Sequence, residues 1–206
     1  KNNMFLTIKG KNNNGNKFIS AALRKGAKYI ASSVITKKFK KKTLKVKNEI
    51  LFLNKFAKLK REASKAKIIA ITGSAGKTSL KNLIKQILQN FRSTYSSPRS
   101  FNNHYGVPIS LSNLNTSHKY GVFEVGMSRK NEIKKLSKLI QPHIAIITNI
   151  GEAHIENFKN INEIAKAKAE IMDSIKEHGT IILNRDDKFF NSLYKKARLK
   201  KLKVFT

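Results

Sequence analysis

Two apolar periodicities alternate along the chain after about residue 65. Short runs rich in Ile and Val, with the length of buried strands, occur at residues 67–72, 120–125, 143–150 and 180–183. Apolar residues at helical spacing follow three of these runs, at residues 78–90, 131–140 and 162–176. Strands that alternate with amphipathic helices predict βαβ units, so we expect an α/β domain with a mostly parallel sheet flanked by helices.

The first 65 residues are rich in Lys and Asn and have a weaker apolar pattern. Residues 18–29 predict an amphipathic helix that ends near Gly26, residues 30–35 a short strand, and residues 48–63 a second helix. One stripe of the second helix is expected to be apolar and contains Leu51, Phe52, Phe56 and Leu59. This segment looks too small and too polar to be a full domain, so we place a boundary near residue 65.

Polar residues and glycines follow the predicted strands at the points where the strands end. Residues 73–78 follow the first run, Glu124 closes the second, Asn149, Gly151 and His154 follow the third, and Asn184, Asp186 and Asp187 follow the fourth. Ligands of open parallel sheets bind beyond the carboxyl ends of the strands. These residues are therefore expected at one shared site.

The composition is that of a folded protein from a reducing compartment. The 206 residues can form one domain of good size or a small and a medium one, and 40% hydrophobic residues can supply a core. The absence of cysteine excludes disulfides and thiolate metal sites. No run reaches the roughly 18 apolar residues of a membrane span. Residues 1–10 show no secretory signal, so a cytoplasmic location is expected.

A large positive charge is one property of nucleic-acid-binding proteins. Lys and Arg total 43 against 12 Asp and Glu, which gives a formal net charge of +31. However, Lys dominates over Arg, the basic residues run along the whole chain, and there is no aromatic and basic ribbon of the kind that stacks bases. We favour solvated lysines in a sequence biased toward Lys, Asn and Ile. Their charge would steer anionic substrates, and no nucleic-acid partner is expected.

The segment TGSAGKTS is the strongest local motif. Gly73 and Gly76 allow a tight turn that aims backbone N–H groups at phosphate oxygens, and the following helix N-terminus adds partial positive charge. Lys77 would reach the terminal phosphates, and the Thr78 hydroxyl would bind Mg²⁺. A glycine usually stands at the position of Ile71, so this is a shorter variant, and a plain glycine-rich turn is the alternative. We expect nucleotide binding by Gly73, Ser74, Ala75, Gly76, Lys77, Thr78 and Ser79.

Other candidate residues are ambiguous when each is taken alone. Glu124 could bind the Mg²⁺ of ATP or be a solvated acid at a strand end. His154 could be a ligand or a surface histidine. Lys168 lies in a helical pattern where a lysine is normally solvated, and Asn102 and Asn103 could be turn residues.

The joint pattern of these residues resembles a known family. The segments ITGSAGKTS, SFNNHYGVPISL, FEVGMS, ITNIGEAHIENF, IAKAKAEI and ILNRDD together resemble the Mur ligase family. Within the family they resemble the type that adds D-alanyl-D-alanine to a UDP-N-acetylmuramoyl tripeptide. The upstream FLTIKGKNNNGNKFISAALRKGAKYI is similar to part of the N-terminal domain of that type. The resemblance covers nearly the whole chain.

The resemblance implies an architecture and a reaction. Residues 1–65 would be part of a small α/β N-terminal domain on the UDP-substrate side, and residues 66–206 part of a P-loop-type central ATP-binding domain. The tripeptide carboxylate would attack the γ-phosphate of ATP, and the amine of D-alanyl-D-alanine would displace phosphate from the resulting acyl phosphate. Lys77 together with Mg²⁺ would neutralise the charge of the transferred group.

The resemblance also implies roles for the ambiguous residues. Thr78 and Glu124 would hold a first Mg²⁺, and His154 would help hold a second. Lys168 matches a carbamylated lysine of the family, in which the ammonium becomes an anion that accepts a metal. Lys166 takes this role if the register of the AKAK repeat is shifted by one step.

Asn102 and Asn103 match a loop on the substrate side of the family, and Asn184 lies where the family meets the adenine. Asn131 departs from the family pattern because a glycine usually stands there. The resemblance implies that the start of the N-terminal domain, the rest of the central domain and the C-terminal domain are missing. The chain alone is then expected to have little or no ligase turnover, because the site closes between domains. A monomer is expected.

Two other classes compete with this interpretation. A related ligase, such as a folylpolyglutamate synthase, would share the phosphate loop, although the segment FNNHYGVP argues against it. A nucleic-acid-binding protein has the charge as its sole support. A regulatory nucleotide switch has no supporting motif beyond the loop.

Overall fold

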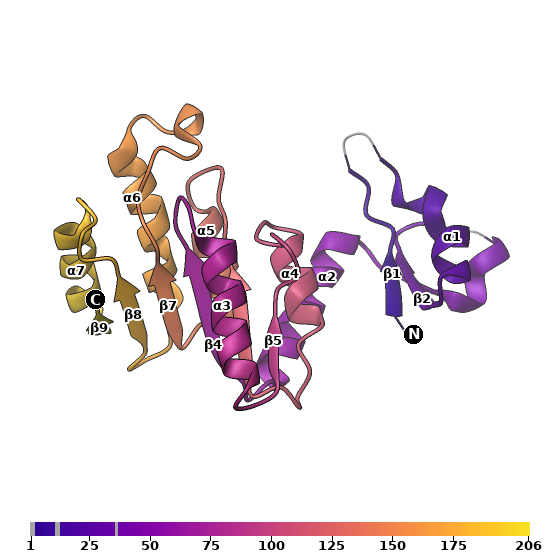
Figure 1. Cartoon of the computed structure of the whole chain (residues 1–206). Coiled ribbons are helices and arrows are strands. Elements are labelled where there is room, and N and C mark those ends of the chain that lie inside the picture. Colours follow the sequence, from indigo (N-terminus) through magenta and orange to yellow (C-terminus); the bar gives the residue numbers. More distant parts are fainter. Residues whose placement is uncertain (1–2, 11–12, 36) are drawn as a thin grey trace. The chain divides into compact units, whose positions relative to one another are not determined.

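Two parallel sheets organise the chain (Figure 1). The computed structural model describes residues 3–10, 13–35 and 37–206. They form two compact units, Lys1–Phe56 and Ala57–Thr206. A three-stranded sheet of order β1-β2-β3 belongs to the first unit, and a six-stranded sheet of order β5-β6-β4-β7-β8-β9 belongs to the second. The α/β class and the mostly parallel sheet predicted from the sequence are confirmed.

The first unit is a small α/β layer. Its elements are β1 (Asn3–Leu6), η1 (Gly15–Phe18), α1 (Ile19–Arg24), β2 (Ala27–Ser32), η2 (Lys37–Lys42) and β3 (Thr43–Lys45). α1 ends at Arg24, close to the predicted helix end near Gly26, where φ is +94° and the chain turns. Residues 27–29 instead pair with β1, and these long-range hydrogen bonds override the local helical pattern.

Helix α2 (Glu49–Ala63) runs across the boundary between the two units, close to the predicted span. It begins after Asn48, whose side chain accepts hydrogen bonds from the first turn. The predicted apolar stripe is wrong, because the buried positions of α2 are Leu53, Ala57 and Arg61. Three side chains of the predicted stripe are exposed: Leu51, Phe56 and Leu59.

Six parallel strands build the second unit. They are β4 (Lys67–Thr72), β5 (Thr94–Ser96), β6 (Tyr120–Glu124), β7 (Ile144–Ile147), β8 (Thr180–Leu183) and β9 (Lys203–Phe205). β4 and β8 have the predicted bounds, whereas β6 and β7 are shorter than their apolar runs. β5 and β9 were not predicted, because three-residue strands at the two edges of a sheet leave little periodic signal.

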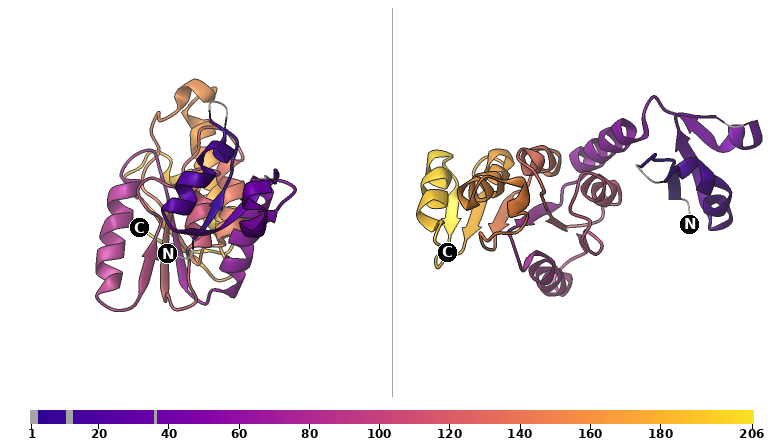
Figure 2. Two further views of the ribbon diagram at one scale, coloured as in Figure 1. Left: turned by 90° about the vertical axis from the view of Figure 1, so that its right-hand side faces the viewer. Right: turned by 90° about the horizontal axis from the view of Figure 1, so that it is seen from above.

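Helices cover both faces of this sheet. They are α3 (Lys77–Gln89), α4 (Gly106–Ser112), α5 (Glu132–Ile140), α6 (Ile161–Ala169) and α7 (Phe190–Leu199), with shorter η3 (Ile155–Asn157) and η4 (Glu170–Ser174). Figure 2 shows α3 on one face and α5 and α6 on the other. The predicted helix over residues 162–176 becomes a 3-10 helix at Glu170 and ends at Ser174. Asn131 precedes α5 with φ +65°, a left-handed conformation that glycine and Asn adopt more readily than other residues.

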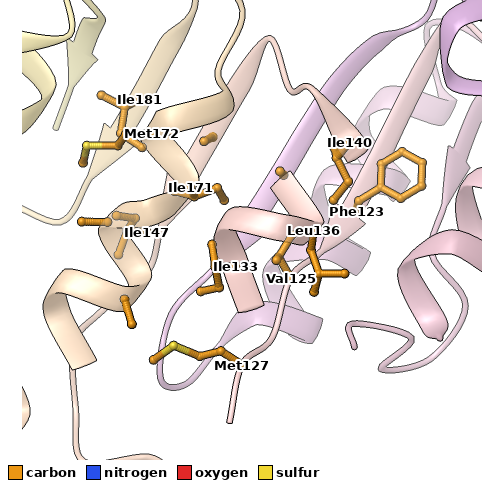
Figure 3. Close-up of a cluster of buried hydrophobic side chains, with 14 of the residues drawn as sticks. Phe123, Val125, Met127, Ile133, Leu136, Ile140, Ile147, Ile171, Met172 and Ile181 are labelled. Atoms are coloured by element: carbon orange, nitrogen blue, oxygen red, sulfur yellow. The ribbon is translucent and has the colours of Figure 1, made fainter. Parts of the chain in front are cut away.

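Alternating side chains of each central strand enter two separate cores. Ile68 and Ala70 of β4 belong to the larger core under α4 to α7, and Ile69 and Ile71 to a smaller core under α3. In the larger core, side chains of β6 and β7 meet those of α5 and η4 (Figure 3). Burial of both faces explains why these strands are continuous apolar runs.

Arg61 attaches the end of α2 to the end of α5. Its side chain is buried, and its Nε donates a hydrogen bond to the carbonyl of Ile140 at 2.6 Å. A terminal nitrogen donates to the carbonyl of Gln141 at 2.8 Å. These carbonyls at the end of α5 have no intrahelical partners, so the guanidinium acts as a C-terminal cap.

A neutral histidine lies at the edge of the sheet where the strands begin, opposite the edge formed by their carboxyl ends. His143 precedes β7, and its Nδ1 accepts the backbone N–H of Ile68 at 2.9 Å. Burial, together with the charges of Arg61, Lys67 and Lys176, lowers its pKa to about 4. The hydrogen bond requires an unprotonated Nδ1, so this contact and the nearby positive charges both favour the neutral imidazole.

The stability of the chain should therefore fall as the pH is lowered from about 6.5 to about 4. In the unfolded chain the pKa returns to its ordinary value of 6.5, so the unfolded state binds a proton in this window that folded His143 does not. Urea unfolding at several pH values measures the effect. His143→Gln keeps an acceptor that does not titrate and should lose less stability across the window. Equal losses in both proteins would contradict this origin.

Candidate active site

The loop between β4 and α3 has the backbone that the glycines predict. Gly73 has φ +150° and Gly76 has φ +78°, which are conformations that side-chain-bearing residues rarely adopt. Gly73 also lies against the chain that follows β7, because a Cβ built on it would be 1.9 Å from Thr148 Oγ1. The turn therefore depends on glycine for both its conformation and its packing.

Hydrogen bonds tie this loop to the segment after β7. The N–H of Ser74 donates to the Asn149 carbonyl at 3.0 Å, and the N–H of Ala75 donates to Asn149 Oδ1 at 2.9 Å. Thr148 Oγ1 donates to the Ala75 carbonyl at 2.6 Å. Ser74 Oγ donates to the Gly151 carbonyl at 2.9 Å. The loop is thus held in shape by protein groups.

Lys77 stands at the start of α3, where the helix exposes backbone N–H groups with no intrahelical acceptor. Its Nζ donates to the carbonyls of Gly73 at 2.7 Å and Ser74 at 3.2 Å. Burial lowers the pKa of Lys77, and the negative charge of Glu124 raises it. A half-buried ammonium beside a helix N-terminus forms a site for a polyanion.

Glu124 ends β6 with a side chain that is only 1% exposed. Its Oε2 accepts the Thr78 hydroxyl at 2.7 Å, and its Oε1 accepts Asn102 Nδ2 at 2.7 Å. The Lys81 ammonium lies 3.9 Å from Oε2. A solvated strand-end acid, one alternative from the sequence, is wrong because this carboxylate is buried and hydrogen-bonded.

Two neighbouring cavities open at the carboxyl edge of the sheet. The smaller, of about 340 Å³, is lined by loop residues 74–79 together with Ser100, Asn102 and Glu124. The larger, of about 640 Å³, is lined by Lys77, Asn102, Asn103, His154 and Lys168 among others. Residues from four segments distant in sequence thus meet at one site, as the rule for parallel sheets predicts.

Lys168 faces the larger cavity from α6 and is 3% exposed. Burial, together with the nearby charge of Lys77, lowers its pKa to about 8. Lys166, the alternative in the AKAK repeat, is exposed. His154 adopts φ +63° with a half-exposed ring, and its Nδ1 lies 3.8 Å from Glu156 Oε1. The larger cavity is therefore lined by both an imidazole and a buried amine.

The asparagines predicted for the site have separate local roles. Asn102 binds Glu124, whereas Asn103 Oδ1 accepts the N–H groups of Tyr105 at 3.1 Å and Gly106 at 2.9 Å at the start of α4. Asn184 lies apart from these groups, exposed at the end of β8, where it closes a turn by accepting the N–H of Asp186. The roles assigned to Asn103 and Asn184 from the sequence stay predictions.

Asp187 links the loop after β8 to the segment after β7, because its Oδ2 accepts the N–H of Ile150 at 2.6 Å. Four residues near the site were not predicted: Lys81, Ser97, His104 and Thr148. Only Lys81 had a usable signal, since it stands one helical turn after Lys77. Contacts of the others join segments far apart in sequence.

The donors at the smaller cavity suit Mg²⁺ that arrives with a polyphosphate. Glu124 and the Thr78 hydroxyl supply two oxygen ligands, and Mg²⁺ commonly takes one or two protein oxygens and fills its shell with water and phosphate oxygens. Within residues 3–10, 13–35 and 37–206, no group of three His, Cys, Asp or Glu side chains could hold a metal by itself. The site therefore fits a nucleotide-borne ion.

Comparisons with known proteins give concordant matches. A model of the Mur ligase middle domain matches residues 71–206. The UDP-N-acetylmuramoyl-tripeptide–D-alanyl-D-alanine ligase of Rickettsia prowazekii is 39% identical over 194 residues, which cover 94% of this chain and 43% of that protein. A crystal structure of MurF from Acinetobacter baumannii has a TM-score of 0.86 at 31% identity and covers 98% of this chain and 44% of that one.

A second solved structure, MurF ligase from Thermotoga maritima in complex with ADP, has a TM-score of 0.83 at 30% identity. It covers 99% of this chain and 47% of that one. The chain thus spans less than half the length of the relatives that it matches. In the described part of the chain, no helix is long and apolar enough to cross a bilayer.

Replacing Gly73 by Ala should destabilise the second unit. The new Cβ would meet Thr148 Oγ1, and φ +150° would be strained. We expect Gly73→Ala to lower the free energy of unfolding by about 2 kcal/mol or more in urea denaturation. Adding Thr148→Ala removes the clash and should restore part of the loss. Gly76→Ala, where a Cβ has open space, isolates the strain of a positive φ. A Gly73→Ala variant as stable as the wild type argues against this packing.

Proposed function

The chain belongs to the Mur ligase family, and we propose that the protein containing it joins D-alanyl-D-alanine to a UDP-N-acetylmuramoyl tripeptide, with cleavage of ATP to ADP and phosphate. The observation that carries this proposal is the match of nearly the whole chain to ligases of that name. The match includes both units, so it involves more than the phosphate loop that many nucleotide-binding proteins share.

The nucleotide would bind at the smaller cavity with its phosphates on the loop and the first turn of α3. Lys77 would exchange its contacts with the carbonyls of Gly73 and Ser74 for the terminal phosphates. Thr78 and Glu124 would hold Mg²⁺, which neutralises charge on the transferred phosphoryl group. The ADP complex of the similar Thermotoga maritima protein supports the binding of a nucleotide.

The acyl-transfer chemistry would take place in the larger cavity. Lys77 borders both cavities, so a γ-phosphate beside it would face a carboxylate held in the larger one. Attack of that carboxylate gives an acyl phosphate, and the amine of D-alanyl-D-alanine then displaces phosphate. His154 and Lys168 would hold a second Mg²⁺ beside the acyl phosphate, and Asn102 and Asn103 would face the substrate.

Carbamylation of Lys168 would convert its amine into a metal ligand. The neutral amine attacks CO₂ to form an N–C bond and releases a proton, which leaves an anionic carbamate. The lowered pKa of Lys168 increases the neutral fraction near neutral pH. The Lys77 charge, which disfavours a second ammonium, would favour a carbamate anion.

Residues 1–65 would then form part of the UDP-substrate side and residues 66–206 part of the ATP-binding domain. The structural division falls within α2, shortly before this boundary. A cytoplasmic location suits a reaction that uses ATP and a nucleotide-linked precursor. We expect a monomer.

A ligation assay tests the proposal on the full-length protein. With ATP, UDP-N-acetylmuramoyl tripeptide and D-alanyl-D-alanine, we expect ADP, phosphate and a UDP-linked pentapeptide. Lys77→Ala should reduce turnover by about 100-fold or more, because it removes charge stabilisation of the transferred group. Lys65→Ala removes an exposed positive charge and is the matched control. Full activity of Lys77→Ala refutes the mechanism, and turnover with glutamate or a folate instead identifies a different ligase.

Isotopically labelled bicarbonate tests the carbamate independently of activity. Carbon NMR should detect a protein carbamate that Lys168→Ala removes and Lys166→Ala retains. The signal should weaken as the pH falls below about 8, because a protonated amine cannot attack CO₂. A carbamate signal that survives in Lys168→Ala, or its absence from the wild type, would exclude Lys168 as the modified residue.

A further inference from the structure

Lys81 is a buried cation that the proposed reaction does not use. It is 1% exposed on α3, one helical turn after Lys77. A buried ammonium is unfavourable unless it is paired and hydrogen-bonded. Its Nζ donates a hydrogen bond to the carbonyl of Arg99 and lies 3.9 Å from Glu124 Oε2. Both partners belong to segments that border the smaller cavity.

The Arg99 carbonyl attaches Lys81 to the segment that carries the substrate-side asparagines. Arg99 has φ +44°, a left-handed conformation that is uncommon for Arg and leaves its carbonyl facing Lys81. Three residues later, Asn102 donates to Glu124 Oε1, and the Asn102 carbonyl accepts the N–H of Gly126 at 2.8 Å. Lys81 and Asn102 therefore hold this segment at two points against the end of β6.

The Glu124 carboxylate is the meeting point of these contacts. Thr78, Lys81 and Asn102 approach it from the phosphate-loop helix and from the segment after β5. Lys81 starts on α3 and reaches both Arg99 and Glu124, so it connects all three parts from a buried position. Burial lowers its pKa, and the Glu124 charge opposes this.

We propose that Lys81 is a positioning residue that holds Glu124 and the segment of residues 97–103 in the arrangement that receives Mg²⁺ with the nucleotide. It would contact neither phosphate nor metal itself. The inference rests on the proposed function, since it assigns Lys81 a task in the binding of Mg²⁺ and ATP. It adds a residue to the site that neither the loop motif nor the strand-end rule identified.

The sign of the effect separates positioning from simple electrostatics. Removing a cation close to a metal site would, by Coulomb repulsion alone, tighten Mg²⁺ binding. Loss of a residue that orients a ligand has the opposite effect and commonly weakens metal affinity by about 10- to 100-fold. Lys81→Met should therefore lower the apparent affinity for Mg²⁺ in nucleotide binding, although it removes a positive charge.

The experiment is calorimetric titration of the full-length protein with a non-hydrolysable ATP analogue, with and without Mg²⁺. For Lys81→Met we expect about 10- to 100-fold weaker apparent Mg²⁺ affinity. Binding without Mg²⁺ should stay within about threefold, because Lys77 and the start of α3 still bind phosphate. Lys81→Arg keeps the charge and the donor and should recover part of the loss. Lys85→Met, one turn further along α3, is the matched control.

Hydrogen exchange provides a second readout. A second variant, Lys81→Gln, is used in case Lys81→Met folds poorly. Lys81→Gln stays polar, but its side chain is shorter than that of Lys and carries no charge, so it should show faster exchange over residues 97–103 than the wild type but unchanged exchange in α5. The inference is overturned if folded variants bind Mg²⁺ with unchanged or higher apparent affinity. It is also overturned if nucleotide affinity falls equally with and without Mg²⁺. If the wild type itself binds no nucleotide, the proposed function fails instead.

Discussion

The hydrogen bond between the Thr78 hydroxyl and the buried Glu124 carboxylate connects the phosphate loop to the next strand of the sheet. The two residues are 46 positions apart in the chain, yet parallel pairing of β4 with β6 brings them to the same edge. The other groups at the smaller cavity are arranged around this contact. Asn102 and Lys81 reach the same carboxylate, so its position depends on three segments at once.

Burial gives three lysines at this edge properties that the surface lysines lack. The formal net charge of +31 is spread along the chain, where most lysines are solvated and contribute a general attraction for anions. Lys77, Lys81 and Lys168 are instead withdrawn from water, and burial lowers the pKa of each. Lys77 is proposed to bind phosphate, Lys81 is paired with a carboxylate, and Lys168 is a candidate for modification. Their environments, rather than their residue type, distinguish them.

The success of the sequence-based predictions followed the strength of the physical signal in each element. β4 is buried on both faces, and β8 is buried on one face and partly buried on the other, so continuous apolar runs marked their bounds correctly. The end of α1 was predicted near Gly26, where the chain turns, whereas the signal failed for α2, where the buried positions differ from the predicted stripe. β5 and β9 were missed because three residues contain too little periodicity, and the seven-residue α4 was also missed.

By itself, the sequence determined the α/β class, the phosphate loop and the family, because these depend on local periodicity, on glycine at positive φ and on residues at fixed spacing. It also placed Glu124, His154 and Lys168 near strand ends or on a helix, without deciding between solvent and site. Only the tertiary structure decided that Glu124 is buried, that Lys168 rather than Lys166 faces the cavity, and that Lys81 is paired. Burial and pairing depend on which distant segments the sheet brings together, and one sequence contains no local signal for that.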